Sequence, residues 1–369
     1  MQNKFHTLYF ESTRNCNFSC KYCSTGSNKN KSFEEIPYDK IISRILIPAK
    51  NLGTRFIEFS GGEFLIREDA YKLLKVASDL GFRIAIASNG STLNEVSIKK
   101  IKNILGGNLL VSLGINSFTE ENINTRTTEG EYTLEKIRLL EKHHININLS
   151  ITIGEFNKKS FSDTVKQIIK FNLPFNRIPF TPRNTPCNEY MIDKKSLKNY
   201  FHPVLQSTYK GYVSYVPFFL EPVIYNQLLS INQPRFSFPT NPSVGCWVGS
   251  FYAINPEGEV APCPLLGDHV SGGNVLDTDL KNILYQSDLF TKITDRSNLK
   301  GKCGKCNFRF TCGGCRVMAY FQSGDLFAED PTCFIEELSD DELKQHTTET
   351  AGQFKNYIRM AKFGSLYRQ

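Results

Sequence analysis

The grouping of the cysteines is the feature that most constrains this chain. Cys16, Cys20 and Cys23 lie close together near the start, Cys187 stands alone, and the remaining cysteines lie between residues 246 and 333. The sequence shows no signal peptide and no uncharged apolar run of transmembrane length, so we expect a cytoplasmic protein with reduced thiols. Eleven cysteines in such a protein indicate metal sites rather than disulfides.

The bulk composition is that of an ordinary globular protein. The 369 residues are 40% hydrophobic and 22% charged, and this length favours one large domain plus a smaller one. The net charge of +7 is mild and spread along the chain, so we expect neither nucleic acid nor a membrane as a partner. An acidic peptide or a carboxylate-rich small molecule is electrostatically compatible with this charge.

The first half of the chain alternates short strand patterns with amphipathic helix patterns, which favours an α/β fold with a parallel sheet. Six strand–helix units before residue 181 fit a partial (β/α)6 TIM-like barrel better than a complete eightfold barrel, which needs ~250 residues. The expected strands are Phe5–Ser12, Phe56–Ser60, Arg83–Ser88, Leu109–Leu113, Asn146–Ile153 and Asn176–Phe180. The expected helices include Glu68–Leu80, Glu95–Leu105 and Tyr132–His143.

Turns that carry cysteine, glycine or polar residues follow the first expected strands. Cys16–Cys23 follow the first strand, Gly61–Glu63 follow the second, and Ser88–Asn89 end the third. Ser112 is expected to end the fourth strand, with Arg126 in the connection beyond it. Because the chemistry of such barrels lies just after the carboxyl ends of the strands, we expect these groups to share one mouth.

Three closely spaced thiolates are typical of zinc sites or of iron–sulfur clusters. Zinc requires four ligands, and no fourth Cys or His lies nearby, whereas a four-iron cluster held by three thiolates keeps one iron open. The run Cys16-x3-Cys20-x2-Cys23, with Tyr22 before the last cysteine, resembles the signature of the radical S-adenosylmethionine (SAM) superfamily. The resemblance implies a [4Fe–4S] cluster whose open iron binds SAM.

The same resemblance implies a set of SAM contacts. The turn Gly61-Gly62-Glu63 is similar to the superfamily's glycine–glycine–glutamate motif, with Phe64 in place of the usual proline. The run that begins at Ser112 lacks the aspartate that the superfamily commonly has there. The further implied contacts are Tyr22, Ser88, Asn89, Ser112 and Arg126, and the Arg126 guanidinium would pair with the SAM carboxylate. The alternative for Arg126 is a solvated surface side chain.

The C-terminal cysteines form a second pattern. The pairs Cys303-x2-Cys306 and Cys312-x2-Cys315 are too close together for a zinc ribbon, and seven cysteines exceed one zinc site. The array resembles the SPASM domain, which carries two auxiliary [4Fe–4S] clusters. By this resemblance the distal cluster would be held by Cys303, Cys306, Cys312 and Cys333, and the proximal cluster by Cys246, Cys263 and Cys315.

The proximal cluster is then one ligand short. Either its fourth position is open, or Cys187, Asp268 or His269 completes it. Cys187 follows the sixth expected strand, near the expected mouth, so it is a candidate ligand or catalytic residue. The alternative is a buried cysteine that acts as a small hydrophobic residue.

These patterns divide the chain into four parts. We expect a radical SAM partial barrel over 1–185, a bridging or lid segment rich in proline and aromatic residues over 186–245, a SPASM domain over 246–338 and a helical tail over 339–369. The third part is too poor in long apolar runs to build a large core of its own. We therefore expect metal to hold it together.

The resemblance implies an enzyme that cleaves SAM reductively to a 5′-deoxyadenosyl radical, which then abstracts hydrogen from a substrate. Three [4Fe–4S] clusters, two of them auxiliary, favour an oxidative outcome. The first hypothesis is a cross-link, thioether or carbon–carbon bond in a ribosomally made peptide or protein. The second is decarboxylation or side-chain modification of a tetrapyrrole, or dehydrogenation of another small molecule.

A third hypothesis is a non-enzymatic electron carrier, and the Gly61-Gly62-Glu63 turn argues against it because a carrier needs no SAM pocket. Two kinds of protein partner follow from the enzyme hypotheses. One is an external one-electron reductant such as flavodoxin or ferredoxin. The other, for a peptide substrate, is a separate leader-peptide-binding protein, because Cys16 lies too near the start for a fused recognition domain.

Overall fold

The computed structural model describes residues 5–27, 34–171, 173, 175–184, 188–198, 213–215, 246–306, 309 and 312–337. Its strands are β1 Thr7–Glu11, β2 Phe56–Ser60, β3 Arg83–Ser88, β4 Leu109–Ile115, β5 Asn146–Ile153, β6 Phe175–Pro179, β7 Val213–Tyr215, β8 Phe251–Ile254 and β9 Val260–Ala261. Its longer helices are α3 Ala70–Asp79, α4 Glu95–Leu105, α5 Glu121–Arg126, α6 Gly130–Lys142, α7 Phe161–Phe171, α10 Leu280–Gln286, α11 Asp288–Ile293 and α13 Arg316–Ser323.

Shorter helical turns complete the described chain. A continuous helical stretch is made of α1 Tyr38–Lys40, a π-helical segment Ile41–Leu46 and α2 Ile47–Asn51, and α12 covers Gly301–Lys305. Single turns of 3-10 helix occupy Phe64–Ile66, Glu155–Asn157, Asn188–Tyr190, Pro264–Leu266, Arg296–Asn298 and Ile335–Glu337.

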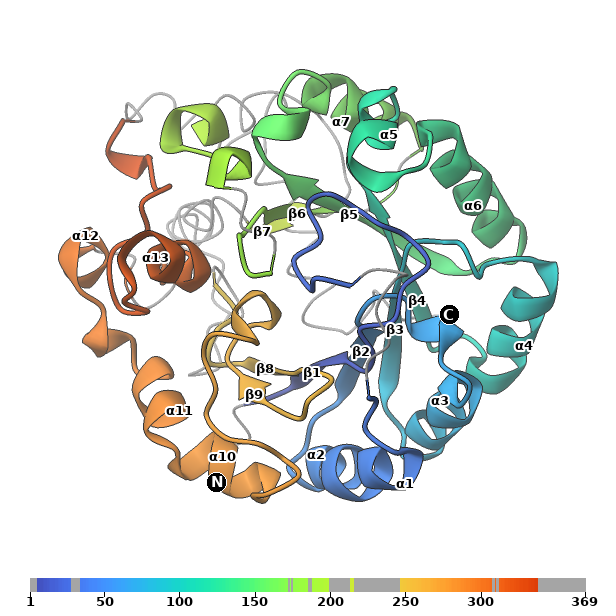
Figure 1. The fold of residues 1–369 in the computed structure, drawn as a ribbon, viewed down its shortest axis with the longest axis horizontal. Coiled ribbons are helices and arrows are strands. Elements are labelled where there is room, and N and C mark those ends of the chain that lie inside the picture. Colours follow the sequence, from blue (N-terminus) through green and yellow to red (C-terminus); the bar gives the residue numbers. More distant parts are fainter. Residues whose placement is uncertain are drawn as a thin grey trace, which may run out of the picture.

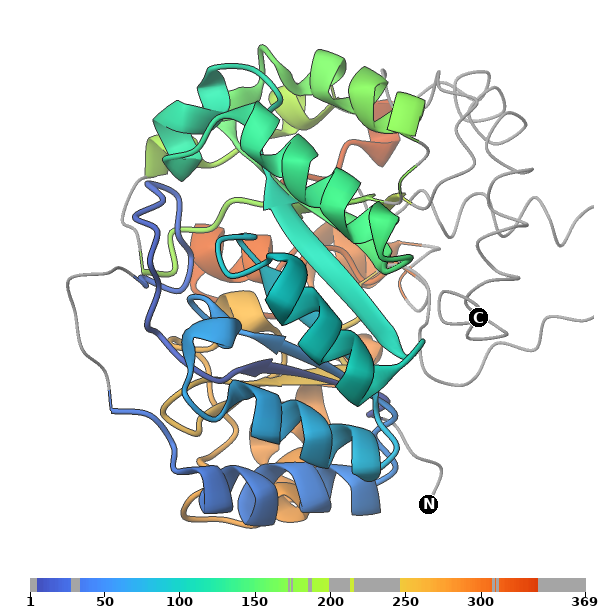
Figure 2. The ribbon, with the colours of Figure 1, turned by 90° about the vertical axis from the view of Figure 1, so that its right-hand side faces the viewer.

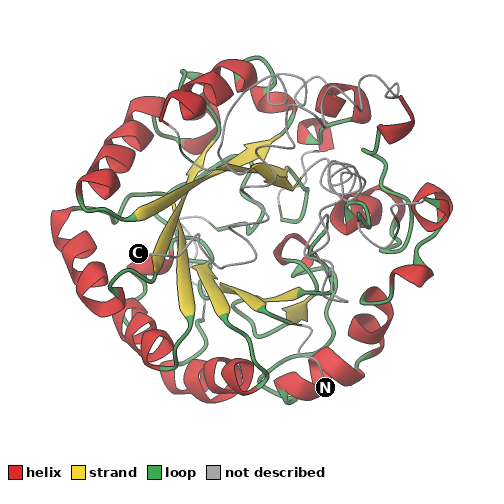
Figure 3. Cartoon of the chain, turned by 180° about the vertical axis from the view of Figure 1, so that it is seen from behind, coloured by secondary structure: helices red, strands yellow, loops and turns green. Residues whose placement is uncertain are grey.

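The strands form one curved sheet in the order β7-β6-β5-β4-β3-β2-β1-β8-β9. Every neighbouring pair is parallel except β8 and β9. The helices follow one another around the outside of this arc (Figures 1 and 3). In the side view they stack in chain order, from α1 and α2 at the bottom to α7 at the top (Figure 2). This arrangement is the predicted partial barrel.

Alternation along the strands separates the core from the barrel interior. In β1, Leu8 and Phe10 are fully buried, whereas Thr7, Tyr9 and Glu11 line an internal cavity. Since side chains of a strand point alternately to its two faces, the first set packs on the helices and the second faces the barrel interior. The interior is therefore polar, and it offers groups that can bind a ligand.

The predicted strands and helices largely agree with the structure. The bounds of β2, β3, β5 and α4 are as predicted, and β1, β6, α3 and α6 differ by one or two residues at their ends. One prediction was wrong, because β4 continues to Ile115 and Ser112 lies in its middle. Ser112 is paired with Asn148 of β5, and pairing with β5 holds the strand extended as far as Ile115.

The cysteine-rich C-terminal region shares the sheet and the core of the barrel. Its strand β8 pairs in parallel with β1, from Thr7 opposite Phe251 to Phe10 opposite Ile254. The Phe5 ring meets Tyr252, Tyr285 and Phe290 edge-on, with ring centroids 6.0, 5.6 and 5.6 Å away. The expectation that metal alone holds this region together is thus corrected, since a continuous hydrophobic cluster joins it to the barrel.

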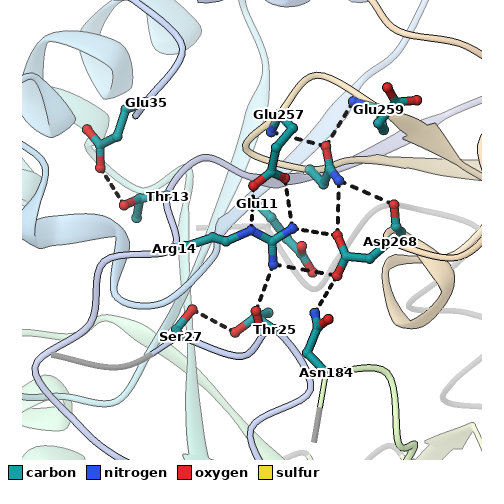
Figure 4. A network of polar contacts seen from close by, with 12 residues as sticks. Glu11, Thr13, Arg14, Thr25, Ser27, Glu35, Asn184, Glu257, Glu259 and Asp268 are labelled. Atoms are coloured by element: carbon teal, nitrogen blue, oxygen red, sulfur yellow. Dashed lines mark hydrogen bonds and ion pairs between the residues drawn. The ribbon is translucent and has the colours of Figure 1, made fainter. Parts of the chain in front are cut away.

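A buried network of charges also joins the two regions. Arg14 Nε donates to Glu257 Oε1 at 2.6 Å, and its Nη2 contacts the Asp268 carboxylate (Figure 4). Arg183 donates to Glu11 at 2.6 and 2.8 Å and to Asp268 at 2.7 Å. Burial alone would raise the pKa of Asp268, but Arg183 and Arg14 outweigh it and hold that pKa below its usual value. The loop that carries Cys16 is thereby fixed to the C-terminal region.

Several predicted features lie outside the described residues. These are Cys187, the tail from residue 339 and most of the bridging segment 186–245, of which only 188–198 and 213–215 are described. No helix in the described ranges is long and apolar enough to cross a membrane.

Candidate functional site

A cavity of 330 Å³ lies inside the barrel, and its lining extends from Thr7, the first residue of β1, to the loops that follow the strands. Its walls come from the inward faces of β1 to β6 and from the first part of the C-terminal region. Six of the predicted cluster cysteines line it, namely Cys16, Cys20, Cys23, Cys246, Cys263 and Cys315. Two cysteine groups more than two hundred residues apart in sequence therefore face one space.

The loop that carries Cys16 packs directly on the turn after β2. The Gly62 amide donates to the Thr13 carbonyl at 2.8 Å, and the Glu63 amide donates to the Asn15 carbonyl at 2.9 Å. A Cβ atom on Gly62 would lie 2.2 Å from the Asn15 oxygen and 2.8 Å from Cys16 Cβ, and Gly61 has a φ of +130°. Both glycines are therefore needed for this close approach.

The Glu63 side chain fixes the next strand rather than facing the cavity. It accepts hydrogen bonds from Ser88 Oγ at 3.0 and 3.1 Å and from the Asn89 amide at 2.7 Å. Burial raises its pKa to about 6, even though these hydrogen bonds act in the opposite direction. Ser88 and Asn89 themselves line the cavity, and Asn89 Nδ2 lies 3.6 Å from Cys16 Sγ.

Arg126 ends α5 and is buried in the cavity wall, so it is not a solvated surface side chain. Its Nη1 donates to Tyr22 OH at 2.6 Å, and the Tyr22 ring stacks on Phe156 with centroids 5.3 Å apart. A Cβ on Gly114 would lie 2.4 Å from Arg126 Nη1, so the glycine in β4 makes room for the guanidinium. The Arg126 Nε atom is buried without a partner among the described residues. A donor of this kind is available to an anionic ligand.

Ser112 lines the cavity from the middle of β4, deeper than Ser88. Its Oγ accepts from Asn148 Nδ2 at 3.3 Å, and Asn148 also donates to Asn176 Oδ1 at 2.9 Å. These contacts make Ser112 part of a polar floor rather than of the cavity's mouth. Its role as a SAM contact stays a prediction.

The other four predicted cluster cysteines line a second cavity, of 460 Å³. These are Cys303, Cys306, Cys312 and Cys333. The division of the C-terminal cysteines between the two cavities is the same as the division between distal and proximal ligand sets implied by the sequence resemblance. The geometry is thus compatible with both sets, and soft thiolates are suitable donors for iron–sulfur clusters.

Burial changes the acidity of the cysteine thiols that line the two cavities. Burial raises the pKa of Cys16 to about 11 and the pKa values of Cys263 and Cys333 to about 12. Without metal these thiols stay protonated, so cluster binding must release their protons.

The candidates for a fourth proximal ligand are constrained by their contacts. Asp268 is held by the Arg14 and Arg183 guanidiniums, and His269 Nε2 lies 2.7 Å from the Arg183 carbonyl oxygen. Neither Asp268 nor His269 lines the two cavities. Cys187 lies outside the described residues, so its place relative to Cys246 stays a prediction.

Sequence reasoning missed the polar residues of the barrel interior. Glu58 in β2 faces the cavity below Ser60, next to Tyr9, whose hydroxyl lies 2.6 Å from Ser60 Oγ. Burial raises the pKa of Glu58 to about 7. The available signal was a polar residue at an inward position of an otherwise apolar strand, Phe56-Ile57-Glu58-Phe59-Ser60.

Comparisons with known proteins agree with this geometry. The profile of the Radical SAM superfamily matches residues 10–168, and that of the SPASM iron–sulfur cluster-binding domain matches residues 246–307. The chain is a radical SAM enzyme. More narrowly, it is one that carries a C-terminal SPASM domain, and its cofactors are SAM, a [4Fe–4S] cluster and auxiliary iron–sulfur clusters.

Individual relatives span nearly the whole chain. An AdoMet-dependent heme synthase of Methanosarcina barkeri is 26% identical, covering 90% of this chain and 97% of the relative. A PqqA peptide cyclase of Bradyrhizobium diazoefficiens is 22% identical, covering 95% and 92%. Among solved structures, Streptococcus suis SuiB bound to precursor peptide SuiA superposes with a TM-score of 0.70 at 16% identity, over 90% of this chain and 76% of SuiB. The last comparison supports the fold.

The packing at Gly62 leads to a testable prediction. Gly62→Ala is expected to lower the iron content of the reconstituted protein by about one third, because the new Cβ displaces the loop that carries Cys16. Iron is measured per chain after anaerobic reconstitution. Gly107→Ala is the matched control, since a Cβ there meets nothing within 4 Å. Equal iron content in the two variants would contradict the proposed role of the close approach.

The pKa of Glu58 leads to a prediction about pH. The folded protein holds the Glu58 proton to about pH 7, whereas the unfolded chain loses it near pH 4.5. The free energy of unfolding therefore falls as pH rises between these two values, and the loss stays constant at higher pH. Glu58→Gln removes this penalty, so its thermal midpoint should exceed that of the parent at pH 8 but not at pH 4.5. The gain should be no more than about 3 kcal/mol, since cavity water solvates part of the charge.

Glu11→Gln serves as the control for this experiment. Glu11 is the neighbouring inward carboxylate of β1, but it is buried in a two-point contact with Arg183. Removing its charge should destabilise the protein at pH 8, the opposite sign to Glu58→Gln. Thermal unfolding of both variants at the two pH values checks the prediction. A stabilisation by Glu58→Gln that is equal at both pH values would show that its pKa is not raised.

Proposed function

We propose that the chain oxidises a side chain of its substrate in the space between two iron–sulfur sites. The observation that carries this proposal is the cavity shared by Cys16, Cys20 and Cys23 with Cys246, Cys263 and Cys315. In this proposal the first three cysteines hold the SAM-binding cluster. The other three hold the proximal auxiliary cluster, and Cys303, Cys306, Cys312 and Cys333 hold the distal one.

The residues around the cavity have distinct roles in this proposal. When bound, the cluster and SAM supply a 5′-deoxyadenosyl radical that takes a hydrogen atom from the substrate. Gly61 and Gly62 bring their backbone close to Cys16, where their carbonyls can hold the SAM amino group. Arg126 is placed to pair with the SAM carboxylate, and Tyr22 orients its guanidinium. Ser88, Asn89 and Ser112 supply further polar contacts, while Glu63 holds Ser88 and Asn89 in place.

The apolar part of the wall serves a second purpose. Phe180, Trp247, Val248 and Leu265 line the same cavity as the six cysteines. Side chains of this kind exclude water from the reacting centre and so protect a substrate radical. The substrate would lose one hydrogen atom to the radical and one electron to the auxiliary site. An external one-electron reductant such as flavodoxin or ferredoxin would supply the electron that starts each cycle.

Two substrate classes have specific support. Similarity to the heme synthase, at 26% identity over 97% of that relative, supports oxidative decarboxylation of a propionate side chain on an iron porphyrin. Similarity to the PqqA peptide cyclase supports cross-linking of a ribosomally made peptide. The sequence alone ranks the peptide first, whereas the relatives give more support to the tetrapyrrole. In both cases the reacting group is a side chain that enters the cavity from a larger molecule.

The cluster assignment is tested by removing the first three cysteines. The Cys16→Ala, Cys20→Ala, Cys23→Ala triple variant should fall from about twelve to about eight irons per chain, as two four-iron clusters remain. It should also lose all SAM cleavage, measured as 5′-deoxyadenosine. The control is the Cys303→Ala, Cys306→Ala variant, which should lose a similar amount of iron but still cleave SAM. A triple variant with unchanged iron content would contradict the assignment.

The substrate is tested with the reconstituted, dithionite-reduced chain and SAM under anaerobic conditions. If the tetrapyrrole proposal is right, an iron porphyrin with propionate side chains should lose about 46 Da per event, as one CO₂ and two hydrogens, with one 5′-deoxyadenosine formed per event. A peptide substrate encoded beside the gene, supplied with any leader-binding protein, should instead lose about 2 Da per cross-link. Formation of 5′-deoxyadenosine with neither substrate altered would contradict both classes.

A further inference from the structure

The segment Cys312-Gly313-Gly314-Cys315 is the shortest covalent connection between the two cavities. Cys312 and both glycines line the second cavity, whereas Cys315 lines the first. The two glycines have φ values of +74° and +60°, a backbone conformation that other residues rarely adopt. The Cys246 amide donates to the Cys312 carbonyl at 2.8 Å, which ties this segment to another of the proposed proximal cysteines.

A buried arginine lies against the first glycine. The Arg296 Nη2 donates to the Cys246 carbonyl oxygen at 2.5 Å. A Cβ on Gly313 would lie 2.7 Å from Arg296 Cζ and 2.9 Å from its Nε, so any side chain there would displace the guanidinium. Arg296 is only 8% exposed, which places its charge in a medium that screens it poorly. The charge thus lies beside Cys246, one of the cysteines that line the first cavity.

A second buried arginine lies against the second glycine. Arg316 begins α13, and its Nη1 donates to the carbonyls of Leu326 and Ala328 at 2.9 and 2.6 Å. Its Nη2 lies 3.6 Å from Cys303 Sγ. A Cβ on Gly314 would lie 2.8 Å from this Nη2 and 3.0 Å from Cys303 Sγ. Among the described residues, Arg316 makes no ion pair with a carboxylate.

The two glycines therefore make room for two cations. A positive charge next to an iron–sulfur cluster stabilises the reduced form, which is more negative by one charge, and a hydrogen bond to a ligand sulfur acts in the same direction. Burial in a low-dielectric site strengthens both effects.

We propose that Arg296 and Arg316 raise the reduction potentials of the proximal and distal auxiliary sites, respectively, and that Gly313 and Gly314 are required to admit them. The proposal rests on the ligand sets given under the proposed function. Its consequence is that the auxiliary sites accept the electron that the substrate radical gives up. Arg296 and Arg316 are positioning residues in this role, because they act on the ligands and need not touch the substrate.

The proposal predicts a difference between charge-removing and charge-keeping variants. Arg316→Gln retains a hydrogen-bond donor but loses the charge, so it should lower the potential of the distal site. Arg316→Lys keeps the charge and should leave the potential nearer to that of the parent. Arg296→Gln and Arg296→Lys should behave in the same way at the proximal site. Arg138→Gln, which removes an exposed cation paired with Glu131, is the control and should shift neither.

The measurement is a potentiometric titration followed by electron paramagnetic resonance. All variants are made in the full chain with Cys16, Cys20 and Cys23 replaced by alanine, so that only the auxiliary sites contribute signals. Iron content is determined first. About eight irons per chain in this background would support the two auxiliary ligand sets, whatever the potentials are. A lower iron content would contradict the proposed function and would not bear on the role of the arginines.

The potentials then decide the present proposal. A full complement of iron with unchanged potentials in both glutamine variants would overturn it. Equal shifts in the glutamine and lysine variants would also overturn it, since that result indicates a structural role. If a glutamine variant loses iron, the lysine variant is read alone. A potential near that of the parent supports the role of the charge, and a lowered potential contradicts it.

Discussion

The parallel pairing of β8 with β1 is the interaction on which the rest of the site depends. It adds the cysteine-rich region to the open edge of the barrel sheet, in the same direction as the barrel strands. Because β8 lies directly beside β1, the segments on either side of β8 border the same barrel interior as the loop after β1. The cavity shared by Cys16 and Cys246 follows from this strand order. Without it, the two cysteine groups would belong to separate bodies joined by a linker.

The charges around Asp268 strengthen this geometry where hydrophobic contacts cannot. Arg14 lies two residues before Cys16 and contacts Asp268, which lies five residues after Cys263 (Figure 4). Arg183 bridges Asp268 to Glu11 in β1. Glu11 accepts two hydrogen bonds from Arg183, and Asp268 contacts both Arg14 and Arg183. These contacts offset the cost of burying the charges. The network thus holds the loop that carries Cys16 in a fixed position relative to the segment that follows Cys263.

Much of the fold could be predicted from the sequence, because the strands and helices are local and strongly patterned. Phe56–Ser60, Arg83–Ser88 and Glu95–Leu105 have the same bounds in the structure as in the prediction. The end of β4 could not be predicted, since Gly114 and Ile115 are extended only because they pair with Ser150 and Ile151 of β5. The cysteine groups that the sequence suggested line the two cavities, whereas the inward position of Glu58 and the burial of Arg126 depend on tertiary contacts. Likewise, the sequence does not show that Arg296 and Arg316 are buried, and only their contacts with Gly313 and Gly314 reveal it.

The position of β1 within the sheet also has a consequence for how the protein is made. Residues Thr7–Phe10 are synthesised long before Phe251–Ile254, which form one of their two neighbours in the sheet. During synthesis this strand has an unpaired edge, and the aromatic side chains that cover Phe5 are missing. The cavity that Cys16 shares with Cys246 can therefore form only after Phe251–Ile254 have been synthesised.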